Sequence, residues 1–425
     1  MSGARQFSNA NRLPKKFVKA AKMLQAVKER QESLNNLIYS ESNAHVDIRS
    51  IYGLVSKALQ HAEELEKMCK ILKEKSESNY IEEYKLKIIL TELYWGKQHL
   101  PHVPENFNVQ LIKANQDLLD KVPASIEDFV PKNSLPRYVR INTLVTSKEY
   151  VMDHLAQDGW ELVETPITYN RFLKRSAKLA EPNFMEDFHY DDLLVFPSKT
   201  PIFKHCLYES GAFVLQAKSS CIPVKILDPK PGDVVMDLCA APGMKTTQIA
   251  AHLENNGIIH AVEVNPKRFA LLQKMLEDYS VECAKTHNED ALALKPDDFP
   301  DVTHILLDPS CSNSGMGRAD VESKSEEQLR KLSAFQTKAL VHALSFPNVK
   351  RIVYSTCSIN TDENEAVIDS AMRQKGDLFR VVEDLPLSED FSRGSLDFEF
   401  GKHGVYFRSD KDQTTGFFVC VIQRI

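Results

Sequence analysis

Apolar residues in the first part of the chain recur at intervals of three and four, the spacing of amphipathic helices. In residues 15–27, lysines occupy the positions between the apolar ones. The same apolar spacing returns in residues 51–59 and 84–94. This pattern predicts a helical N-terminal domain over residues 1–125.

The periodicity changes near Leu135, where residues 137–142 alternate as a strand does. This alternation puts Tyr138, Arg140 and Asn142 on one face. An aromatic, a cation and an amide together suit RNA contact by stacking and charge, and a structural role is an equal alternative. The other elements expected here are a helix over 145–158 and strands over 160–163 and 193–196. The region 130–208 is therefore predicted to be a small α+β module.

From residue 209 onward, short apolar runs alternate with amphipathic stretches. The expected strands are 234–237, 258–264, 281–286, 304–307 and 351–354. The expected helices between them include 246–253, 268–279 and 326–344. Such alternation predicts an α/β domain over 209–425 with a mostly parallel sheet covered by helices on both faces. Residues 417–422 are expected to close the sheet as an edge strand.

The turn after the first of these strands has the character of a ligand-binding loop. Asp237 ends the strand, and Ala-Ala-Pro-Gly brings bare backbone N–H groups to the start of the next helix. Gly243 stands alone, so the dinucleotide pattern G-x-G-x-x-G is absent. Glu263 ends the following strand, where nucleotide-binding folds place an acid against ribose hydroxyls. A ligand with ribose and carboxylate but no pyrophosphate, such as S-adenosyl-L-methionine, fits this pattern. A tight turn without a cofactor is the alternative.

Two later strands are each followed by a cysteine. Asp308 and Cys311 come after one strand, and Cys357 after another. A lone buried cysteine usually packs in a core, but two at matching strand ends beside a carboxylate favour a reactive site. Such a site suits methylation of pyrimidine carbon 5, in which a thiolate first adds to carbon 6 and an acid supports the ring near N3. Lys218 and Lys245 are both candidates for the cation that activates the thiol.

Composition and cysteine usage indicate the compartment of the protein rather than the reaction that it catalyses. The net charge is −6. Residues 1–30 hold eight Lys/Arg against one acid, and residues 381–400 hold six acids against one base. The eight cysteines form no C-x-x-C pair and no histidine is spaced for zinc, so no metal site is expected. We expect reduced thiols, no membrane span and no signal peptide.

Three motifs together resemble those of the Sun-domain (Fmu/Nol/Nop, RsmB-like) RNA cytosine-5 methyltransferases. They are Asp237-Leu-Cys-Ala-Ala-Pro-Gly-Met-Lys245-Thr, Asp308-Pro-Ser-Cys311-Ser and Ser355-Thr-Cys357-Ser. The resemblance implies a Rossmann-like S-adenosylmethionine-dependent methyltransferase domain that is preceded in the sequence by a small RNA-binding module. It implies that Cys357 is the nucleophile and that Cys311 assists product release. The cofactor residues that it implies are Cys239, Ala240, Ala241, Pro242, Gly243, Met244, Lys245, Glu263, Arg268, Asp290 and Asp308.

Within this family the chain looks most like the branch that acts on large-subunit ribosomal RNA. Its Leu-Val-Phe-Pro197 segment and helical N-terminal region are similar to that branch. Pro309 stands one residue earlier than in most relatives, and Asn313 replaces a glycine, a change that asparagine tolerates at positive φ. The resemblance implies a ribosomal RNA or pre-ribosome partner and a nucleolar location in the nucleus. Transfer RNA as substrate and a non-catalytic ribosome-assembly role are the alternatives.

Overall fold

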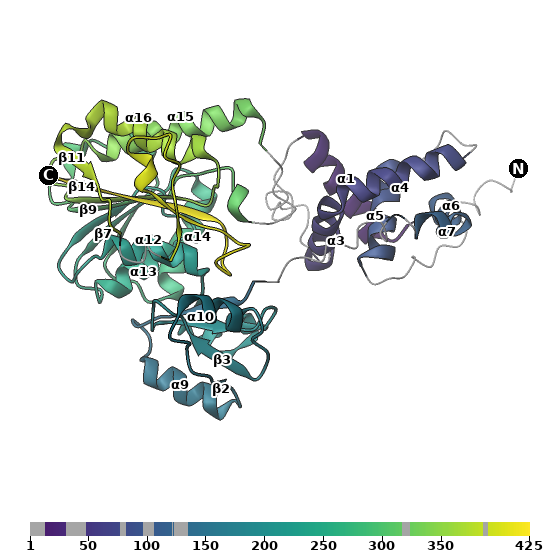
Figure 1. Cartoon of the computed structure of the whole chain (residues 1–425), viewed down its shortest axis with the longest axis horizontal. Coiled ribbons are helices and arrows are strands. Elements are labelled where there is room, and N and C mark those ends of the chain that lie inside the picture. Colours follow the sequence, from purple (N-terminus) through teal and green to yellow (C-terminus); the bar gives the residue numbers. More distant parts are fainter. Residues whose placement is uncertain are drawn as a thin grey trace, which may run out of the picture. The chain divides into compact units, whose positions relative to one another are not determined.

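The computed structural model describes residues 13–30, 48–76, 82–96, 106–120, 122, 135–316, 324–385 and 390–425. Two compact units lie within Met1–Pro131 and within Lys132–Gly317 and Ser323–Ile425, and each is considered by itself (Figure 1). The division into three domains stays a prediction. In the part of the chain described, no helix is both long and apolar enough to cross a bilayer.

The described residues of the first unit are mostly helical, as the apolar spacing predicts. The helices are α1 (Lys15–Arg30), α3 (Ile48–Gln60), α4 (Ala62–Lys75), α5 (Glu83–Tyr94), α6 (Phe107–Ala114) and α7 (Gln116–Leu119). α1 packs against α3 and α5. Phe17, Leu24 and Val55 are buried in their shared core. Lys16 of α1 forms an ion pair with Glu92 of α5, with its Nζ 2.8 Å from the carboxylate.

The small module begins the second unit with a five-stranded sheet in the order β2-β3-β4-β1-β5. Its strands are β1 (Arg137–Ile141), β2 (Glu161–Leu162), β3 (Asn183–Glu186), β4 (Leu193–Phe196) and β5 (Phe213–Leu215). Its helices are α9 (Lys148–Gln157), α10 (Tyr169–Ser176), η2 (Ile202–Lys204) and α11 (Cys206–Glu209). The predicted strand at 193–196 is confirmed. β5 lies beyond residue 208 but pairs antiparallel with β1, so this sheet extends past the predicted boundary.

The remainder of the unit is built on a nine-stranded sheet with the order β12-β13-β14-β10-β9-β6-β7-β8, in which β11 also pairs with β14. Its strands are β6 (Val234–Asp237), β7 (Ile258–Val262), β8 (Ala284–His287), β9 (His304–Leu307), β10 (Arg351–Thr356), β11 (Phe379–Val381), β12 (Ser392–Arg393), β13 (Val405–Phe407) and β14 (Phe417–Arg424). The five strands from β6 to β10 pair in parallel, which confirms the predicted core of the sheet.

The prediction that residues 417–422 form an edge strand is wrong. β14 pairs antiparallel with β10 on one side and with β13 on the other. Its first six residues are all buried. A strand covered on both faces and paired on both sides needs an unbroken apolar run, which is what this segment has.

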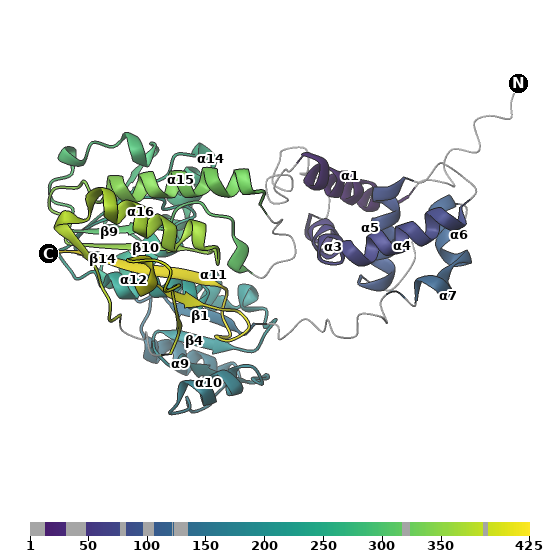
Figure 2. The same cartoon turned by 45° about the horizontal axis from the view of Figure 1, so that its top comes forward.

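Helices cover both faces of the large sheet (Figures 1 and 2). They are α12 (Lys218–Leu227), α13 (Met244–His252), α14 (Pro266–Asp278), α15 (Glu326–Ala343) and α16 (Glu365–Lys375), with short 3-10 turns η3 (Ala291–Ala293), η4 (Pro296–Asp298), η5 (Ser314–Met316), η6 (Thr361–Glu363), η7 (Gly376–Leu378) and η8 (Gly401–His403). Ile352 and Tyr354 of β10 share a core with α15 and α16. Val353 between them packs with α12 and α13 instead. Successive side chains of a strand point to opposite faces of the sheet, so β10 packs against the helices on both faces.

The strand order sets where a ligand can bind. The chain runs outward from β6 to β7 and β8, then crosses back to β9 on the other side of β6. In parallel sheets the crevice beyond the carboxyl ends of strands at such a reversal is the usual ligand site. The predicted cofactor loop and both cysteines follow the carboxyl ends of β6, β9 and β10.

Candidate active site

The loop between β6 and α13 is closely packed against its surroundings. Gly243 caps α13 with φ of +112°, a conformation that glycine adopts without strain. A Cβ at this position would lie 3.1 Å from Leu272 Cδ1. Thr246 Oγ1 donates to the buried Asp237 carboxylate at 2.8 Å. Burial raises the pKa of Asp237 to about 6, against the opposing effect of this hydrogen bond.

The predicted ribose-binding acid lies at the end of β7, next to this loop. Glu263 is buried, and its Oε1 accepts the backbone N–H of Asn265 at 2.8 Å. Arg268 Nη1 lies 3.3 Å from the other Glu263 oxygen. The same guanidinium donates to the carbonyl of Ala241 at 2.6 Å, so Arg268 joins the acid to the β6–α13 loop. The β6–α13 loop, Glu263 and Arg268 are therefore held together by hydrogen bonds and an ion pair.

Asp290 follows β8, the next strand along the sheet. Its Oδ1 accepts the Leu292 N–H at 3.0 Å and begins the η3 turn. Asn288 in the same segment donates to the Glu263 carbonyl at 2.7 Å. This bond places the Asp290 segment beside Glu263. The Asp290 side chain itself caps the start of η3.

The two predicted catalytic cysteines face each other. Cys311 Sγ and Cys357 Sγ are 3.0 Å apart. Asn313, which has φ of +58° as its identity allows, accepts from Cys357 Sγ at 2.8 Å. The hydrogen bond with Cys357, with burial as the second cause, raises the pKa of Cys311 well above its ordinary value.

Lys245 is the cation at this site. Its Nζ lies 2.6 Å from Asp308 Oδ2, and Ser355 Oγ donates to Asp308 Oδ1 at 2.9 Å. Burial acts to lower the pKa of Lys245, but the charge and hydrogen bond of Asp308, with a contribution from Cys357, raise it. The other candidate, Lys218, is buried against Asp187 at 2.7 Å in a different part of the unit.

Sequence reasoning missed the acid that holds the two cysteine loops together. Glu363 is fully buried and accepts from the N–H and the Oγ of Ser312, at 2.8 and 2.5 Å. Its Oε2 also accepts from Ser358 Oγ at 2.6 Å. Ser312 and Ser358 each come directly after a cysteine. That repeated Cys-Ser pair was the one sequence signal of a shared partner.

The prediction that Tyr138, Arg140 and Asn142 offer an RNA-binding face is wrong. All three are buried, Arg140 with only 1% of its surface exposed. Arg140 donates to Gln216 Oε1 and to Thr247 Oγ1, both at 2.9 Å. These bonds join β1 to α13, so the structural alternative is confirmed.

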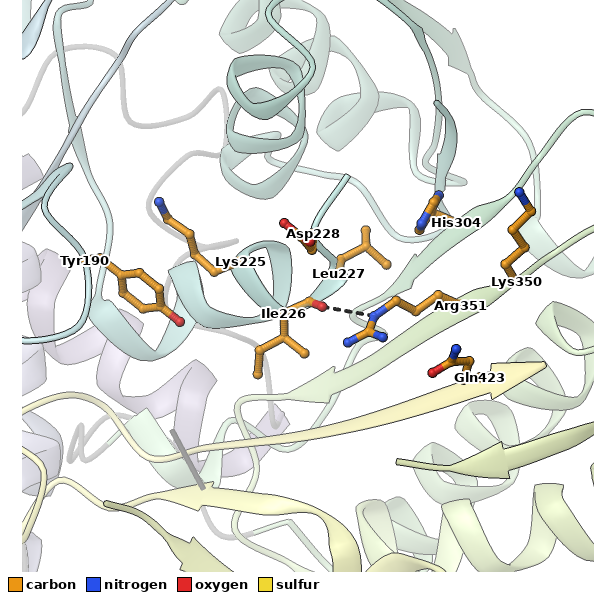
Figure 3. Close-up of a pocket in the computed structure, with 9 residues that line it drawn as sticks. All are labelled: Tyr190, Lys225, Ile226, Leu227, Asp228, His304, Lys350, Arg351 and Gln423. Carbon is orange, nitrogen blue, oxygen red and sulfur yellow. Dashed lines mark hydrogen bonds between the residues drawn. The ribbon is translucent and has the colours of Figure 1, made fainter. Parts of the chain in front are cut away.

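A cavity of about 570 Å³ lies at the other end of the sheet (Figure 3). His304 and Arg351 line it from the first residues of β9 and β10. Lys225 and Asp228 line it from the end of α12, and Arg351 Nε donates to the Ile226 carbonyl at 3.0 Å. The cysteines follow the opposite strand ends, so this cavity is separate from the sulfur pair.

Comparison with known proteins agrees with this architecture. Residues 224–423 match the profile described as 16S rRNA methyltransferase RsmB/F. Residues 135–216 match the ferredoxin-like domain of NOL1/NOP2/Sun domain family member 5. A crystal structure of a methyltransferase homolog protein from Pyrococcus horikoshii aligns with 76% of this chain and 96% of its own, with a TM-score of 0.55 and 23% identity. That likeness is one of fold.

Two curated relatives match over nearly the whole chain. The 28S rRNA (cytosine-C(5))-methyltransferase of Drosophila melanogaster is 35% identical, over 97% of this chain and 96% of the relative. The protein of the same name from Mus musculus is 32% identical, over 96% of this chain and 90% of the relative. With its paired cysteines and the two profile matches, the chain belongs to the Sun-domain family of RNA cytosine-C5 methyltransferases.

Proposed function

We propose that this chain methylates carbon 5 of a cytosine in large-subunit ribosomal RNA through a covalent adduct with Cys357. The observation that carries the proposal is the pair of sulfur atoms 3.0 Å apart at the ends of adjacent parallel strands. Carbon 5 of a pyrimidine is a weak nucleophile until a thiolate has added to carbon 6. One of two neighbouring thiols can make that bond while the other handles a proton.

We assign the nucleophilic sulfur to Cys357 and the proton-carrying thiol to Cys311, whose pKa is raised by its hydrogen bond with Cys357 and by burial. When Cys357 gives up the proton that it donates to Asn313, the Cys311 thiol can donate to the Cys357 sulfur instead. Once Cys357 has bonded to carbon 6 it is a neutral thioether, so the main cause of the raised Cys311 pKa is gone. After carbon 5 has received its methyl group, Cys311 releases its proton to solvent and its thiolate takes the proton from carbon 5. The electron pair of that C–H bond restores the ring double bond and expels Cys357.

We assign the stabilisation of the ring near N3 to Lys245 and Asp308. Both Asp308 oxygens accept hydrogen bonds, one from Lys245 and one from Ser355. Asp308 therefore acts near ring atom N3 through the ammonium group that it holds. A fixed cation stabilises the negative charge that develops on the ring when the thiolate adds.

The residues around the β6–α13 loop suit S-adenosyl-L-methionine, which supplies an electrophilic methyl group when bound. Glu263 has the place of a ribose-binding acid at a strand end, and its position is set by Asn265 and Arg268. The first backbone N–H groups of α13 lack partners within the helix and suit the carboxylate of the cofactor. We propose that Cys239 to Lys245, Glu263, Arg268, Asp290 and Asp308 hold this cofactor.

The choice of substrate follows the two curated relatives, whose names specify 28S rRNA. The small module matches a ferredoxin-like domain of one Sun-domain member over residues 135–216. We extend the proposal to a pre-ribosomal partner and to action in the nucleolus, where large-subunit RNA is made and modified.

Methyl transfer to extracted RNA tests the proposal. Purified chain with labelled S-adenosylmethionine is expected to transfer about one methyl group to large-subunit rRNA and none to transfer RNA. Transfer to transfer RNA alone would support the second substrate class, and RNA binding without incorporation would support an assembly role.

Cysteine variants test the assignment of roles. Cys357→Ala is expected to lose both activity and the denaturant-stable RNA complex. Cys311→Ala is expected to accumulate that complex because the adduct cannot resolve. Cys283→Ala, a half-buried thiol elsewhere in the chain, serves as the control. A stable complex in Cys357→Ala, or full activity in Cys311→Ala, would show that the roles are misassigned.

A further inference from the structure

A group of side chains of the kinds that bind metal ions lies in the small module, outside the active site. α9 carries His154, and Asp158 directly follows the helix one turn later. Cys206 begins α11, and His205 precedes it. We call these four residues the α9–α11 cluster. α9 lies in the small module at a distance from the layers of the large sheet (Figure 1).

The ligand atoms of the α9–α11 cluster converge. His154 Nε2 is 3.0 Å from Cys206 Sγ and 3.6 Å from Asp158 Oδ2. One ligand atom from each of these three residues lies within 4.8 Å of the others. Ligands of a tetrahedral Zn²⁺, with bonds of about 2.0 to 2.3 Å, are about 3.3 to 3.6 Å apart. The three side chains need only small movements to reach that arrangement.

The fourth residue has a polar atom that the protein leaves unsatisfied. His205 Nε2 is buried and has no hydrogen-bond partner. It lies 3.2 Å from Asp158 Oδ2, but outside hydrogen-bonding geometry. Its Nδ1 accepts the Leu207 N–H at 3.2 Å, so the neutral ring carries its proton on Nε2. A small turn of the Asp158 carboxylate toward a metal would let this N–H donate to it.

We propose that His154, Asp158 and Cys206 bind Zn²⁺, with His205 orienting the Asp158 carboxylate and a water completing the coordination. Imidazole, carboxylate and thiolate together suit zinc better than the hard cations Mg²⁺ and Ca²⁺. Binding releases the Cys206 thiol proton to solvent and forms the metal–sulfur bond. The ion joins α9 to the segment before β5, two parts of the module that are far apart in sequence. This separation is why no zinc spacing is visible in the sequence.

The test uses the full chain, stripped with a chelator and then given Zn²⁺ alone. One tightly bound zinc per chain by elemental analysis and a higher melting temperature are expected. Substitution with Co²⁺ should give the absorption of tetrahedral cobalt with a thiolate charge-transfer band. Because the active-site thiols can also hold metal, the Co²⁺ spectrum is recorded again with Cys311→Ala and Cys357→Ala combined, where it should persist.

Three variants distinguish the roles within the cluster. Cys206→Ala and His154→Ala are expected to weaken zinc binding more than 100-fold. His205→Ala is expected to weaken it about 10- to 100-fold, the range for a residue that orients a ligand. Cys283→Ala is the matched control and should bind as the parent does. Less than about a fifth of an equivalent of zinc on the parent chain would overturn the proposal. Unchanged affinity in Cys206→Ala would do the same, since the cluster would then be only a hydrogen-bonded surface group.

Discussion

Replacement of Glu363 by glutamine tests whether a buried acid sets the spacing of the two sulfurs. The side chain keeps its shape but loses its charge and gains an NH₂ group. In the parent protein Glu363 Oε2 accepts from Ser312 Oγ at 2.5 Å and from Ser358 Oγ at 2.6 Å. Its Oε1 accepts from the Ser312 N–H and from Gln336. An amide cannot accept at both ends, so at least two donors lose an acceptor or must rotate.

The expected effect is large for a substitution of one atom. A hydrogen bond to a charged group contributes about 1 kcal/mol more than a neutral one. With two short bonds affected, Glu363→Gln should lower the free energy of unfolding by about 2 to 3 kcal/mol. The same bonds position the loops of Cys311 and Cys357. A displacement of 1 Å can lower a rate about 100-fold, so kcat should fall by about 10- to 100-fold with little change in KM for RNA.

Urea unfolding and methyl transfer kinetics measure the two effects. Glu327→Gln is the control, because Glu327 is an exposed residue of α15 that pairs with Lys331. It should change neither quantity. A Glu363→Gln protein with parental kcat would refute the argument that this carboxylate positions the sulfurs. If stability fell and kcat did not, Glu363 would be a stabilising residue only.

Two other buried charges, at Asp237 and Arg140, give further predictions. The pKa of Asp237 is raised from 3.8 to about 6 in the folded state. Between these two values the folded protein keeps a proton that the unfolded chain has lost. The free energy of unfolding should therefore fall by about 3 kcal/mol as the pH rises from 4 to 6, and stay level above pH 6. Asp237→Asn should remove this fall in urea unfolding at pH 4.5 and 7, and an unchanged pH dependence would contradict the pKa shift. Arg140→Ala should cost about 3 kcal/mol or more, because it leaves a cavity and two unpaired acceptors. Arg140→Met removes the same charge and the same two donors, but it should cost less because its side chain fills most of the cavity. Equal melting temperatures for the two Arg140 variants would refute this.

Much of the fold could be predicted because local patterns carry it. The strands at 193–196 and 304–307 have the predicted bounds, and the lysine-bearing helix near the N-terminus begins at Lys15. Apolar periodicity survives in the structure because each element buries one face or both. The 417–422 segment was misplaced because an unbroken apolar run gives burial on two faces but not the identity of the neighbouring strands.

Some residues of the candidate site could also be predicted from the sequence, and others could not. Asp308, Cys311 and Cys357 were found because they follow strand ends, and parallel strands bring their carboxyl ends to one edge. Glu363 was missed because its partners lie on two loops joined only through space. Tyr138, Arg140 and Asn142 were misjudged, since polarity along a strand does not say whether a polar face meets solvent or another part of the protein.

The amino-acid sequence by itself determined the order and type of the elements, the strand-end chemistry and the family, because these depend on residues close together along the chain. Only the tertiary structure decided that the two sulfurs lie 3.0 Å apart, that Lys245 rather than Lys218 pairs with Asp308, and that α9 and α11 bring a histidine, an acid and a thiol together. Such contacts join residues tens of positions apart. Their distances are set by how strands pair and helices pack, and no local pattern records them.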